Sequence, residues 1–473
     1  MHTRRTKIVC TIGPACEDPA ALRALATAGM DVARLNFSHG APAWHRRRAG
    51  QIRALQQELG RPIAILQDLS GPKLRIGDLP AEGMKLAPGQ EVLLTPESMS
   101  IKESDHIPVP LPALLSQLNT GQQIFLDDGI FLLEVRHRVG NGVRCEVING
   151  GLLRSRKGIV APGVALPIGA VTEKDLADLR LGLEMGVDWV AVSYVHDSGD
   201  LQTVRAALDE AGADTPIIAK IENREAVENL EAILAAADGV MVARDDLGVE
   251  LPLYRVPILQ KEIISRTVAA GKPVITATQM LESMQNCPRP TRAEVSDVAN
   301  AILDGTSAVM LSAETAIGQY PAESVAMMDE IAEHTEASID YGELSARLSS
   351  HAGGSITEAI SHGVAQIAGD LDAACILCST SSGFTARMVS RTRPRAPIVA
   401  ATASPETHRR LCLIWGVRSL LMAPTHDTDA MLRGTIEGAL AAGWIQKGDT
   451  VVIASASPVG TPGRTNLIKV DRI

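Results

Sequence analysis

Residues 272–320, KPVITATQMLESMQNCPRPTRAEVSDVANAILDGTSAVMLSAETAIGQY, have the pattern of a strand, a loop, a helix and a second strand. A β-branched run ends at Thr278, and a second apolar run ends at Ser312 and Glu314. Hydroxyl and carboxylate groups at the carboxyl ends of neighbouring parallel strands lie where a β/α barrel carries its chemistry. The stretch therefore predicts a barrel and one part of its functional site.

The helix predicted between these two strands has clear limits. Thr291 and Glu294 have the T-x-x-E spacing of a capping box, and Asp304 with Gly305 supplies a stop. Apolar side chains recur at helical spacing along one face. These side chains are Val295, Val298, Ala299, Ile302 and Leu303.

The composition favours layered α/β domains. A chain of 473 residues is too long for one core, so we expect two to four domains. Aromatic residues make up only 3% of the chain, so Ala, Val, Leu and Ile must fill the core. The net charge of −10, with dispersed basic residues, argues against nucleic acid as a partner, although a small anionic substrate remains compatible.

Cysteine usage and hydropathy indicate a cytoplasmic protein. The seven cysteines form no disulfide framework, and Cys375 and Cys378 lie in the apolar run AACILC, which resembles a strand more than a redox or zinc motif. No run approaches the ~20 apolar residues of a membrane span. The apolar run after the basic start MHTRRTKIVCTIG is too short for a signal peptide.

Eight apolar runs predict a (β/α)8 TIM barrel that is interrupted after its third strand. Residues 1–70 and 168–340 are assigned to this barrel, and residues 71–167, rich in Gly, Pro and hairpin turns, to an inserted all-β lid. Residues 341–473 are assigned to a C-terminal α/β open-sheet domain, which begins with a polar linker over 341–355. The eight barrel runs are KIVCTI, VARLNF, AILQDL, DWVAVSYV, PIIAKIE, GVMVAR, PVITAT and SAVMLSAE.

Polar residues follow the barrel strands and should form one ring. Glu222 and Asp246 follow adjacent strands, and two carboxylates suit Mg²⁺ or Mn²⁺. Lys220 shares a strand face with Glu222, and Arg34 lies across the ring, an arrangement that suits phosphoryl transfer. Taken singly, each residue fits a surface ion pair or a helix cap better than a catalytic role, and only their common position favours chemistry.

Seven motifs make the chain resemble pyruvate kinases over essentially its whole length. The resemblance implies transfer of the phosphoryl group of phosphoenolpyruvate to ADP, giving pyruvate and ATP at the last step of glycolysis, with an enol oxygen as acceptor in the reverse direction. The motifs are TKIVCTIGPA (6–15), RLNFSHG (34–40), GPKLR (71–75), KIEN (220–223), VARDDLGVE (242–250), ITATQMLESM (275–284) and PRPTRAEVSDVANAILDGTSAVMLS (288–312).

The resemblance also implies residue roles. Lys220 stabilises the transition state and the enolate, Glu222 and Asp246 bind the metal, and Arg34 contacts the phosphoryl group. Thr278, with the backbone near Asp245 and Asp246, holds the substrate carboxylate. Ser312 and Glu314 belong to the proton-relay network. The nucleotide-side positions are Pro14, Asn36, His39, Arg75 and Lys157, the last from the lid that closes over the barrel mouth.

Two residues depart from the family pattern. Lys73 stands where many members carry Glu and need K⁺, held by residues that match Asn36, Ser38, Asp68 and Leu69. Leu69 lacks a side-chain oxygen, so the Lys73 ammonium is expected to replace K⁺; the alternative is a solvated hinge lysine with the ion still bound. Asp245 replaces a Gly, and it either caps a turn, adds a metal ligand or weakens phosphoenolpyruvate binding.

The C-terminal domain contains a loop that fits an allosteric phosphate, from a sugar phosphate or AMP. An ordinary Ser/Gly turn is the alternative, and Phe384 stands where a basic residue is common. The expected contacts are Thr380, Ser382, Gly383, Thr385 and Arg464.

Rival functions remain open at this stage. A related lyase on a similar barrel would form no ATP, and a silent paralogue acting as a metabolite sensor would bind phosphoenolpyruvate without turnover because of Asp245. The resemblance also implies a homotetramer, with no nucleic-acid or membrane partner.

Overall fold

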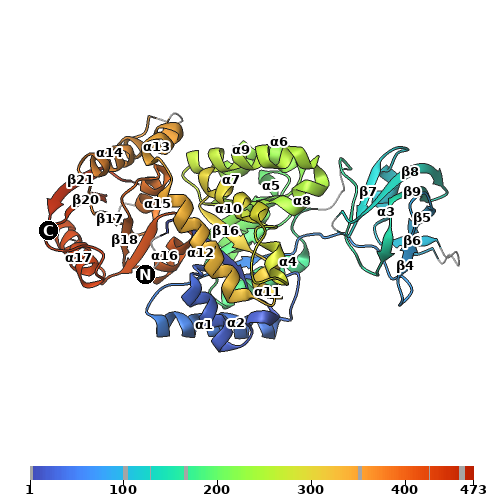
Figure 1. The fold of residues 1–473 in the computed structure, drawn as a ribbon, viewed down its shortest axis with the longest axis horizontal. Helices are drawn as coiled ribbons and strands as arrows, with labels where there is room; N and C mark the ends of the chain where they lie inside the picture. Colours follow the sequence, from blue (N-terminus) through green and yellow to red (C-terminus); the bar gives the residue numbers. More distant parts are fainter. Residues whose placement is uncertain are drawn as a thin grey trace.

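The computed structural model describes residues 4–99, 105–127, 129–164, 169–349, 354–425, 427–456 and 464–473. A central barrel lies between a β-rich lid at one end of the molecule and a C-terminal α/β domain at the other (Figure 1). Within the described residues, no helix combines the length and the apolar run needed to cross a bilayer.

The barrel closes as the sequence predicts. Its eight described strands are all parallel, in the order β1-β16-β15-β14-β13-β12-β3-β2, so the interrupted chain resumes beside the strand that it left. Every strand lies within a run assigned from the sequence and is one to four residues shorter than that run. Their bounds are β1 Lys7–Thr11, β2 Val32–Asn36, β3 Ala64–Asp68, β12 Trp189–Val192, β13 Ile217–Ile221, β14 Gly239–Ala243, β15 Val274–Ala277 and β16 Ala308–Leu311.

Helices surround the barrel, and the predicted helix α10 (Arg292–Leu303) is confirmed. The Thr291 hydroxyl accepts the Glu294 N–H at 3.2 Å, and the Glu294 carboxylate accepts the Thr291 N–H at 2.7 Å, which completes the capping box. The other helices of this region are α1 Pro19–Ala28, α2 Pro42–Leu59, α4 Glu173–Glu184, α5 Ser198–Glu210, α6 Arg224–Glu228, α7 Leu230–Ala236, α8 Arg244–Glu250, α9 Val256–Ala269, α11 Ala313–Ala316 and α12 Pro321–Ala337. Short 3-10 turns are η1 Pro14–Cys16, η2 Leu253–Arg255 and η3 Glu282–Gln285.

The barrel is filled with aliphatic side chains, as the low aromatic content requires. Leu66, Ile218 and Met310 belong to an inner cluster of buried side chains. Each of these three side chains is 1% exposed or less. That cluster continues into the C-terminal domain, where Ile376 is also fully buried. The barrel interior is therefore a packed core rather than a pore, and the site must lie at a rim.

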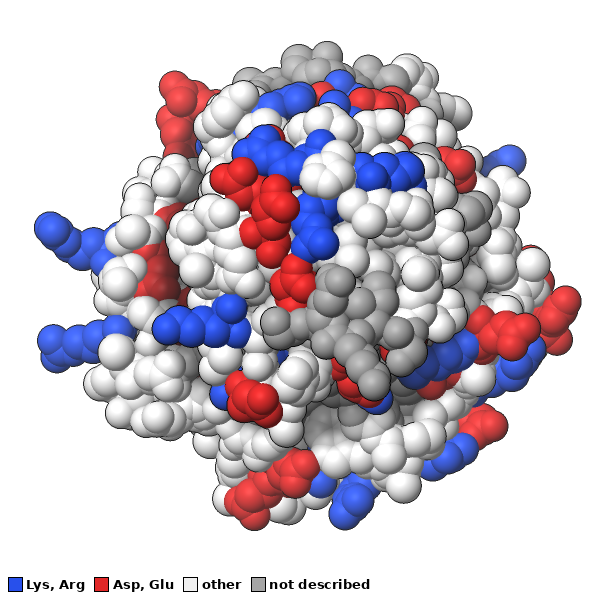
Figure 2. Space-filling model, turned by 90° about the vertical axis from the view of Figure 1, so that its right-hand side faces the viewer, with Lys and Arg blue, Asp and Glu red and all other residues white. Residues whose placement is uncertain are grey.

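The lid carries a six-stranded sheet in the order β11-β7-β8-β9-β5-β6 and a separate β10-β4 pair. The expectation of an all-β insertion needs one correction, because Pro112 begins a short helix, α3 (Pro112–Gln117). Acidic and basic side chains are intermingled on the outer face of the lid (Figure 2). The strands are β4 Met84–Leu86, β5 Glu91–Pro96, β6 His106–Val109, β7 Gln123–Leu126, β8 Phe131–Val139, β9 Gly142–Asn149, β10 Gly151–Leu153 and β11 Ile159–Val160.

The C-terminal domain is an open sheet in the order β19-β18-β17-β20-β21. Four of these strands match predicted runs, whereas β21 (Leu467–Arg472) was not foreseen and pairs antiparallel with β20. The other elements are α14 Ile356–Asp370, β17 Cys375–Ser379, α15 Phe384–Arg391, β18 Ile398–Thr402, α16 Pro405–Arg410, η4 Leu411–Leu413, β19 Val417–Leu421, α17 Thr428–Ala441 and β20 Thr450–Ser455.

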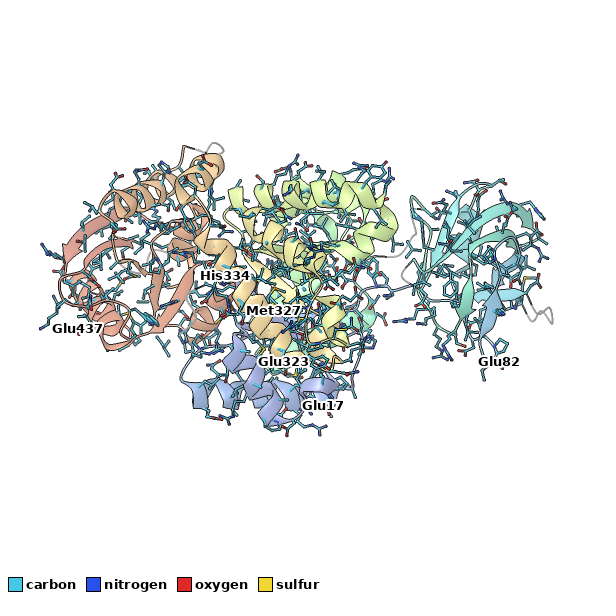
Figure 3. All side chains as sticks on the ribbon, viewed as in Figure 1. Glu17, Glu82, Glu323, Met327, His334 and Glu437 are labelled. Atoms are coloured by element: carbon cyan, nitrogen blue, oxygen red, sulfur yellow. The ribbon has the colours of Figure 1, made fainter. Side chains whose placement is uncertain are left out.

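The predicted linker over 341–355 is partly wrong, because its first residues form helix α13 (Tyr341–Ser349). The Asp340 carboxylate accepts the Gly342 N–H at 2.9 Å and the Glu343 N–H at 3.0 Å, which caps this polar helix. The preceding helix, α12, runs along the barrel, and in Figure 3 His334 lies nearer the C-terminal domain than Glu323 does. The connection between the two domains is therefore largely helical in its described part.

Candidate active site

Polar and charged side chains from four strands, β1, β2, β3 and β13, meet at the carboxyl end of the barrel. Arg34 at the end of β2 donates from Nε to Asp68 Oδ2 at 2.6 Å and from Nη1 to Thr11 Oγ1 at 2.9 Å. The Lys220 ammonium of β13 lies 3.5 Å from the second Asp68 oxygen. Asp68, at 1% exposed, thus joins the two cations that the sequence placed in one ring.

Lys220 is held in a fixed position. Its Nζ lies 2.7 Å from Glu222 Oε1 and donates to Ser193 Oγ at 2.8 Å. Burial alone would lower the pKa of Lys220, but the Asp68 and Glu222 carboxylates raise it above its ordinary value, so the ammonium stays charged. Burial also opposes ionisation of Asp68, yet Lys220 and Arg34 lower its pKa.

Glu222 and Asp246 form a carboxylate pair that suits a divalent cation. Burial, and then the Glu222 charge, raises the pKa of Asp246 to about 7. A cation between the two groups would remove that repulsion. No group of three or more His, Cys, Asp or Glu ligands is found in the described part of the chain. Two carboxylates nevertheless fit Mg²⁺, which keeps waters and substrate oxygens as its other ligands.

The backbone around this carboxylate pair is strained at two residues, and the sequence analysis predicted neither. Tyr194 has φ 55° and Thr278 has φ 68°, a left-handed region that aromatic and β-branched residues rarely adopt. Each such residue costs on the order of 1–3 kcal/mol and persists where the surroundings enforce it. The Tyr194 N–H donates to Glu222 Oε2 at 2.6 Å, and the Asp245 N–H donates to Thr278 Oγ1 at 3.1 Å. The strained residues therefore fix the Glu222 carboxylate and the Thr278 hydroxyl.

Arg244 follows β14 but does not face the barrel mouth. Its guanidinium donates to Asp297 Oδ2 at 2.6 Å and to the carbonyls of Ala277 at 3.2 Å and Gln279 at 3.0 Å. It therefore stabilises the strained turn after β15 rather than contributing charge to the ring.

Ser312 and Glu314 differ in how they are bound. Glu314, 2% exposed, accepts the Leu281 N–H at 3.0 Å and the Ser312 N–H at 2.7 Å, and burial raises its pKa. Glu314 thus holds the two loops after β15 and β16 together. The Ser312 hydroxyl is buried, and within the described residues it has no hydrogen-bond partner. It is available to a water or a substrate group.

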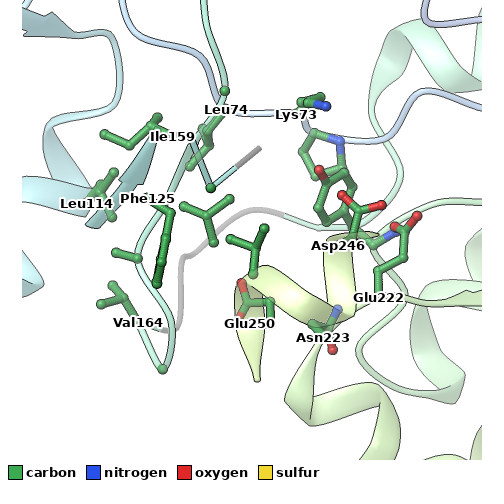
Figure 4. Close-up of a pocket in the computed structure, with 18 of the residues that line it drawn as sticks. Lys73, Leu74, Leu114, Phe125, Ile159, Val164, Glu222, Asn223, Asp246 and Glu250 are labelled. Carbon is green, nitrogen blue, oxygen red and sulfur yellow. The ribbon is translucent and has the colours of Figure 1, made fainter. Parts of the chain in front are cut away.

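A cavity of about 430 Å³ lies between the lid and this end of the barrel. One wall carries apolar lid side chains such as Phe125, and the other carries Glu222, Asp246 and Glu250 (Figure 4). Lys73, at the start of the lid, and Tyr194 also line it. A largely apolar wall facing carboxylates is suited to excluding water from this end of the barrel.

Family comparisons agree with this geometry. The family models "Pyruvate kinase, barrel domain" and "Pyruvate kinase, alpha/beta domain" match residues 3–325 and 358–471. The chain belongs to the pyruvate kinase family.

Several relatives cover the whole chain. The pyruvate kinase of Geobacillus stearothermophilus is 46% identical over 99% of this chain and 80% of its own length. That of Clostridium acetobutylicum is 41% identical over 99% of both chains. The crystal structure of a pyruvate kinase from Cryptosporidium parvum superposes with a TM-score of 0.94 at 35% identity, covering 99% of this chain and 96% of that one.

The nucleotide positions expected for a pyruvate kinase are divided between barrel and lid. Pro14 begins η1, and Asn36 ends β2. Burial, and then the positive charges of Arg75 and Lys73, lowers the pKa of His39, so these groups share a basic region beside the lid hinge. Lys157 belongs to the lid, where its Nζ lies 2.9 Å from Asp127.

The positions that would hold K⁺ in other pyruvate kinases are engaged within the chain. Asn36 Oδ1 accepts the Ser38 N–H at 3.0 Å, and Asp68 is bound by Arg34. The Leu69 side chain is buried at 2% exposure, and its carbonyl accepts the Ser193 hydroxyl at 2.8 Å. Ser193, which the sequence analysis did not single out, therefore links Leu69, just before the lid begins, to Lys220.

The candidate effector loop begins helix α15. Gly383 has φ 80° and serves as the helix N-cap, which explains the glycine. Ser382 and Arg464 are exposed. Thr385, by contrast, is 3% exposed, and its hydroxyl lies 2.9 Å from that of Thr465. Ser382 and Arg464 can thus meet a phosphate, whereas Thr385 lies beneath the loop.

Proposed function

We propose that this chain is an active pyruvate kinase that transfers the phosphoryl group of phosphoenolpyruvate to ADP, giving pyruvate and ATP. In the reverse direction, the enol oxygen of pyruvate would accept the group. The observation that carries the proposal is the Lys220 ammonium, 11% exposed and 2.7 Å from Glu222, which lines the lid-covered cavity together with Asp246.

The proposed mechanism uses charge neutralisation and positioning. Glu222 and Asp246 would hold Mg²⁺ or Mn²⁺, which neutralises phosphoryl oxygens when bound. Lys220, kept protonated by Asp68 and Glu222, stabilises the charge that develops on the enolate oxygen. Arg34, fixed by Asp68, contacts the phosphoryl group.

The remaining roles follow the same geometry. The Thr278 hydroxyl and the backbone at Asp245 and Asp246 would hold the substrate carboxylate, supported by the 3.1 Å bond between Asp245 N–H and Thr278 Oγ1. The buried Ser312 hydroxyl would carry a proton toward the enolate, with Glu314 as the group that positions its loop. The nucleotide would lie on the side of Pro14, Asn36, His39, Arg75 and Lys157.

Coupled pyruvate formation from phosphoenolpyruvate and ADP is the direct test. An active enzyme forms pyruvate and ATP in equal amounts. Tight binding of phosphoenolpyruvate without turnover would instead support the sensor alternative. Asp245→Gly then measures the cost of this departure, since a large fall in KM would show that the Asp245 charge weakens substrate binding.

We also propose that Lys73 makes the enzyme independent of K⁺. Support comes from its place in the wall of the same cavity as Glu222 and Asp246, and from the internal bonding of Asn36 and Asp68. Full activity in tetramethylammonium buffer is expected, and Lys73→Glu should introduce K⁺ activation. Strict K⁺ dependence of the unchanged enzyme would contradict this.

Assembly, regulation and location form the last part of the proposal. We propose a cytoplasmic homotetramer at the last step of glycolysis, with residues 71–167 moving as the lid. Leu253, Tyr254 and Ile258 are 75%, 80% and 65% exposed on neighbouring turns, an apolar patch suited to a second copy. Tyr254→Glu should lower the mass measured by light scattering.

A panel of sugar phosphates and AMP would test whether the loop at Ser382 binds an allosteric effector.

A further inference from the structure

A second, much smaller cavity lies far from the active site, where the amino end of the barrel meets the C-terminal domain. The centre of a water-sized sphere can move through about 10 Å³ there, so the cavity has room for one water molecule or one small ion. The barrel contributes residues 271–273 and Ser307, which precede β15 and β16. The C-terminal domain contributes side chains of α15 and Trp415.

All the charged side chains that line this cavity are cationic. Four cationic side chains line it, and its lining contains no Asp or Glu. One of them, Arg391, is paired with Glu358 at 2.5 Å. The nearby Asp238 lies outside the lining and is bound by Arg205 at 2.6 Å. The other three lining cations are Lys272, Arg387 and Arg393.

Arg393 is the most buried of these cations, at 2% exposed. Its guanidinium stacks on Trp415 at 4.6 Å and donates to Gly305 O at 2.8 Å and Ser307 Oγ at 3.1 Å, so it fastens the C-terminal domain to the barrel. Its Nε, however, has no hydrogen-bond partner among the described residues. Leaving a buried charged donor unsatisfied is costly.

Arg387, like Arg393, has a buried Nε without a hydrogen-bond partner among the described residues. Burial lowers the pKa of Arg387, and only the charge of Asp238 opposes that effect. Because a guanidinium stays protonated in proteins, its burial has to be offset by nearby negative charge rather than by loss of the proton.

We propose that this cavity binds one small inorganic anion of halide size, which bridges the guanidinium groups of Arg387 and Arg393. So small a space favours a single-atom anion over the larger phosphate and carboxylate groups. A water molecule would accept a hydrogen bond but would add no negative charge to the lining, so Asp238 and Glu336, which lie outside it, would remain the carboxylates that act on Arg387 and Arg393. The anion would therefore stabilise the contact between barrel and C-terminal domain and raise the thermal stability of the whole enzyme.

Bromide, a halide with an anomalous signal, tests the site directly in crystals of the unchanged enzyme. We expect one anomalous peak between Arg387 and Arg393. In solution, replacing gluconate by chloride at constant ionic strength should raise Tm by several degrees. Arg387→Met should abolish this shift, while Arg395→Met, which removes an exposed arginine of the adjacent loop, should retain it.

The outcomes separate an anion from the alternatives. No bromide peak, together with the same chloride dependence in wild type and Arg387→Met, would mean that the cavity holds water only and would overturn the proposal. If Arg387→Met fails to fold, Arg387→Lys serves instead, since it keeps the charge but loses the bridging Nε. A bromide peak that disappears in that variant would sustain the proposal.

Discussion

At the carboxyl end of the barrel, Lys220 lies between Asp68 and Glu222, whereas at the amino end Arg4 lies between Asp31 and Asp329. Arg4 is buried, the Lys220 side chain is only 11% exposed, and both have two carboxylate partners. Arg4 also donates to the Thr6 carbonyl at 2.6 Å.

The surroundings of the two cations differ. Beside Lys220, a further carboxylate is crowded by Glu222, and Tyr194 and Thr278 adopt left-handed backbone conformations. The Arg4 cluster has neither feature. Buried charge alone therefore does not mark a site. Unbalanced carboxylates and backbone strain together distinguish the proposed ligand-binding end of the barrel from the end that stabilises the fold.

The largest effect should come from Lys220→Met. Removing the charge that stabilises the developing enolate should lower kcat by about 10³–10⁴-fold. A coupled pyruvate assay measures this, with Lys174→Met, an exposed lysine whose pairing with Asp178 is near the surface, as the control. If kcat fell less than tenfold, Lys220 would not be the transition-state cation.

Arg4→Met, in contrast to Lys220→Met, should lower the stability of the fold and leave kcat nearly unchanged. Breaking a buried ion pair leaves Asp31 and Asp329 without their cation, at a cost of about 3 kcal/mol. The apparent Tm from calorimetry should drop markedly, while kcat per folded molecule stays within about twofold. A loss of kcat at unchanged Tm would contradict the division between the two ends.

Ser193→Ala tests whether the position of the Lys220 ammonium matters for catalysis in addition to its charge. The Ser193 hydroxyl accepts from Lys220 at 2.8 Å and donates to the Leu69 carbonyl at 2.8 Å. Its loss should lower kcat by about tenfold with little change in KM, because the ammonium is misplaced but present. Ser193→Thr should restore most of the rate, and failure of that rescue would indicate a purely structural role.

The smallest effect concerns Glu250, a carboxyl group at the edge of the same cavity. Burial, and then the Glu225 charge, raises the pKa of Glu250 from 4.5 to about 7. A carboxyl whose pKa is raised by folding stabilises the protein at low pH, and that contribution is lost as pH rises from about 4.5 to about 7. Glu250→Gln should therefore raise stability at pH 8 by about 1 kcal/mol after allowance for solvent screening, and by less at pH 5.

Calorimetry at the two pH values measures this difference. Glu228→Gln, an exposed neighbour on α6, is the control and should show no pH-dependent change. An equal effect of Glu250→Gln at both pH values would mean that its pKa is not raised.

The sequence located the barrel strands well because each is a short β-branched run ended by a polar residue. Thr291 and Glu294 also marked α10, since capping is a local effect. Strand β21 was missed because LIKVDR alternates as an edge strand does and lacks a continuous apolar run. Helix α13 was missed because its Gly and Ser content is typical of linkers.

The candidate site was only partly predictable for a related reason. Residue types at strand ends identify Lys220 and Glu222, but the contacts that hold them depend on distant segments. Ser193 and Tyr194 reach these residues from the neighbouring strand, and no local pattern encodes a left-handed Tyr194. The inward direction of Arg34 and the outward direction of Arg244 are likewise set by their partners, Asp68 and Asp297.

The dependence of pyruvate formation on Mn²⁺ concentration, compared between wild type and Glu222→Gln, tests the central claim most directly. If the carboxyl end of the barrel is a metal-assisted phosphoryl-transfer site, the wild-type rate vanishes without the cation. The variant should then need at least about 100-fold more Mn²⁺ for half-maximal rate. Equal Mn²⁺ dependence in the two proteins would contradict the assignment of this carboxylate pair.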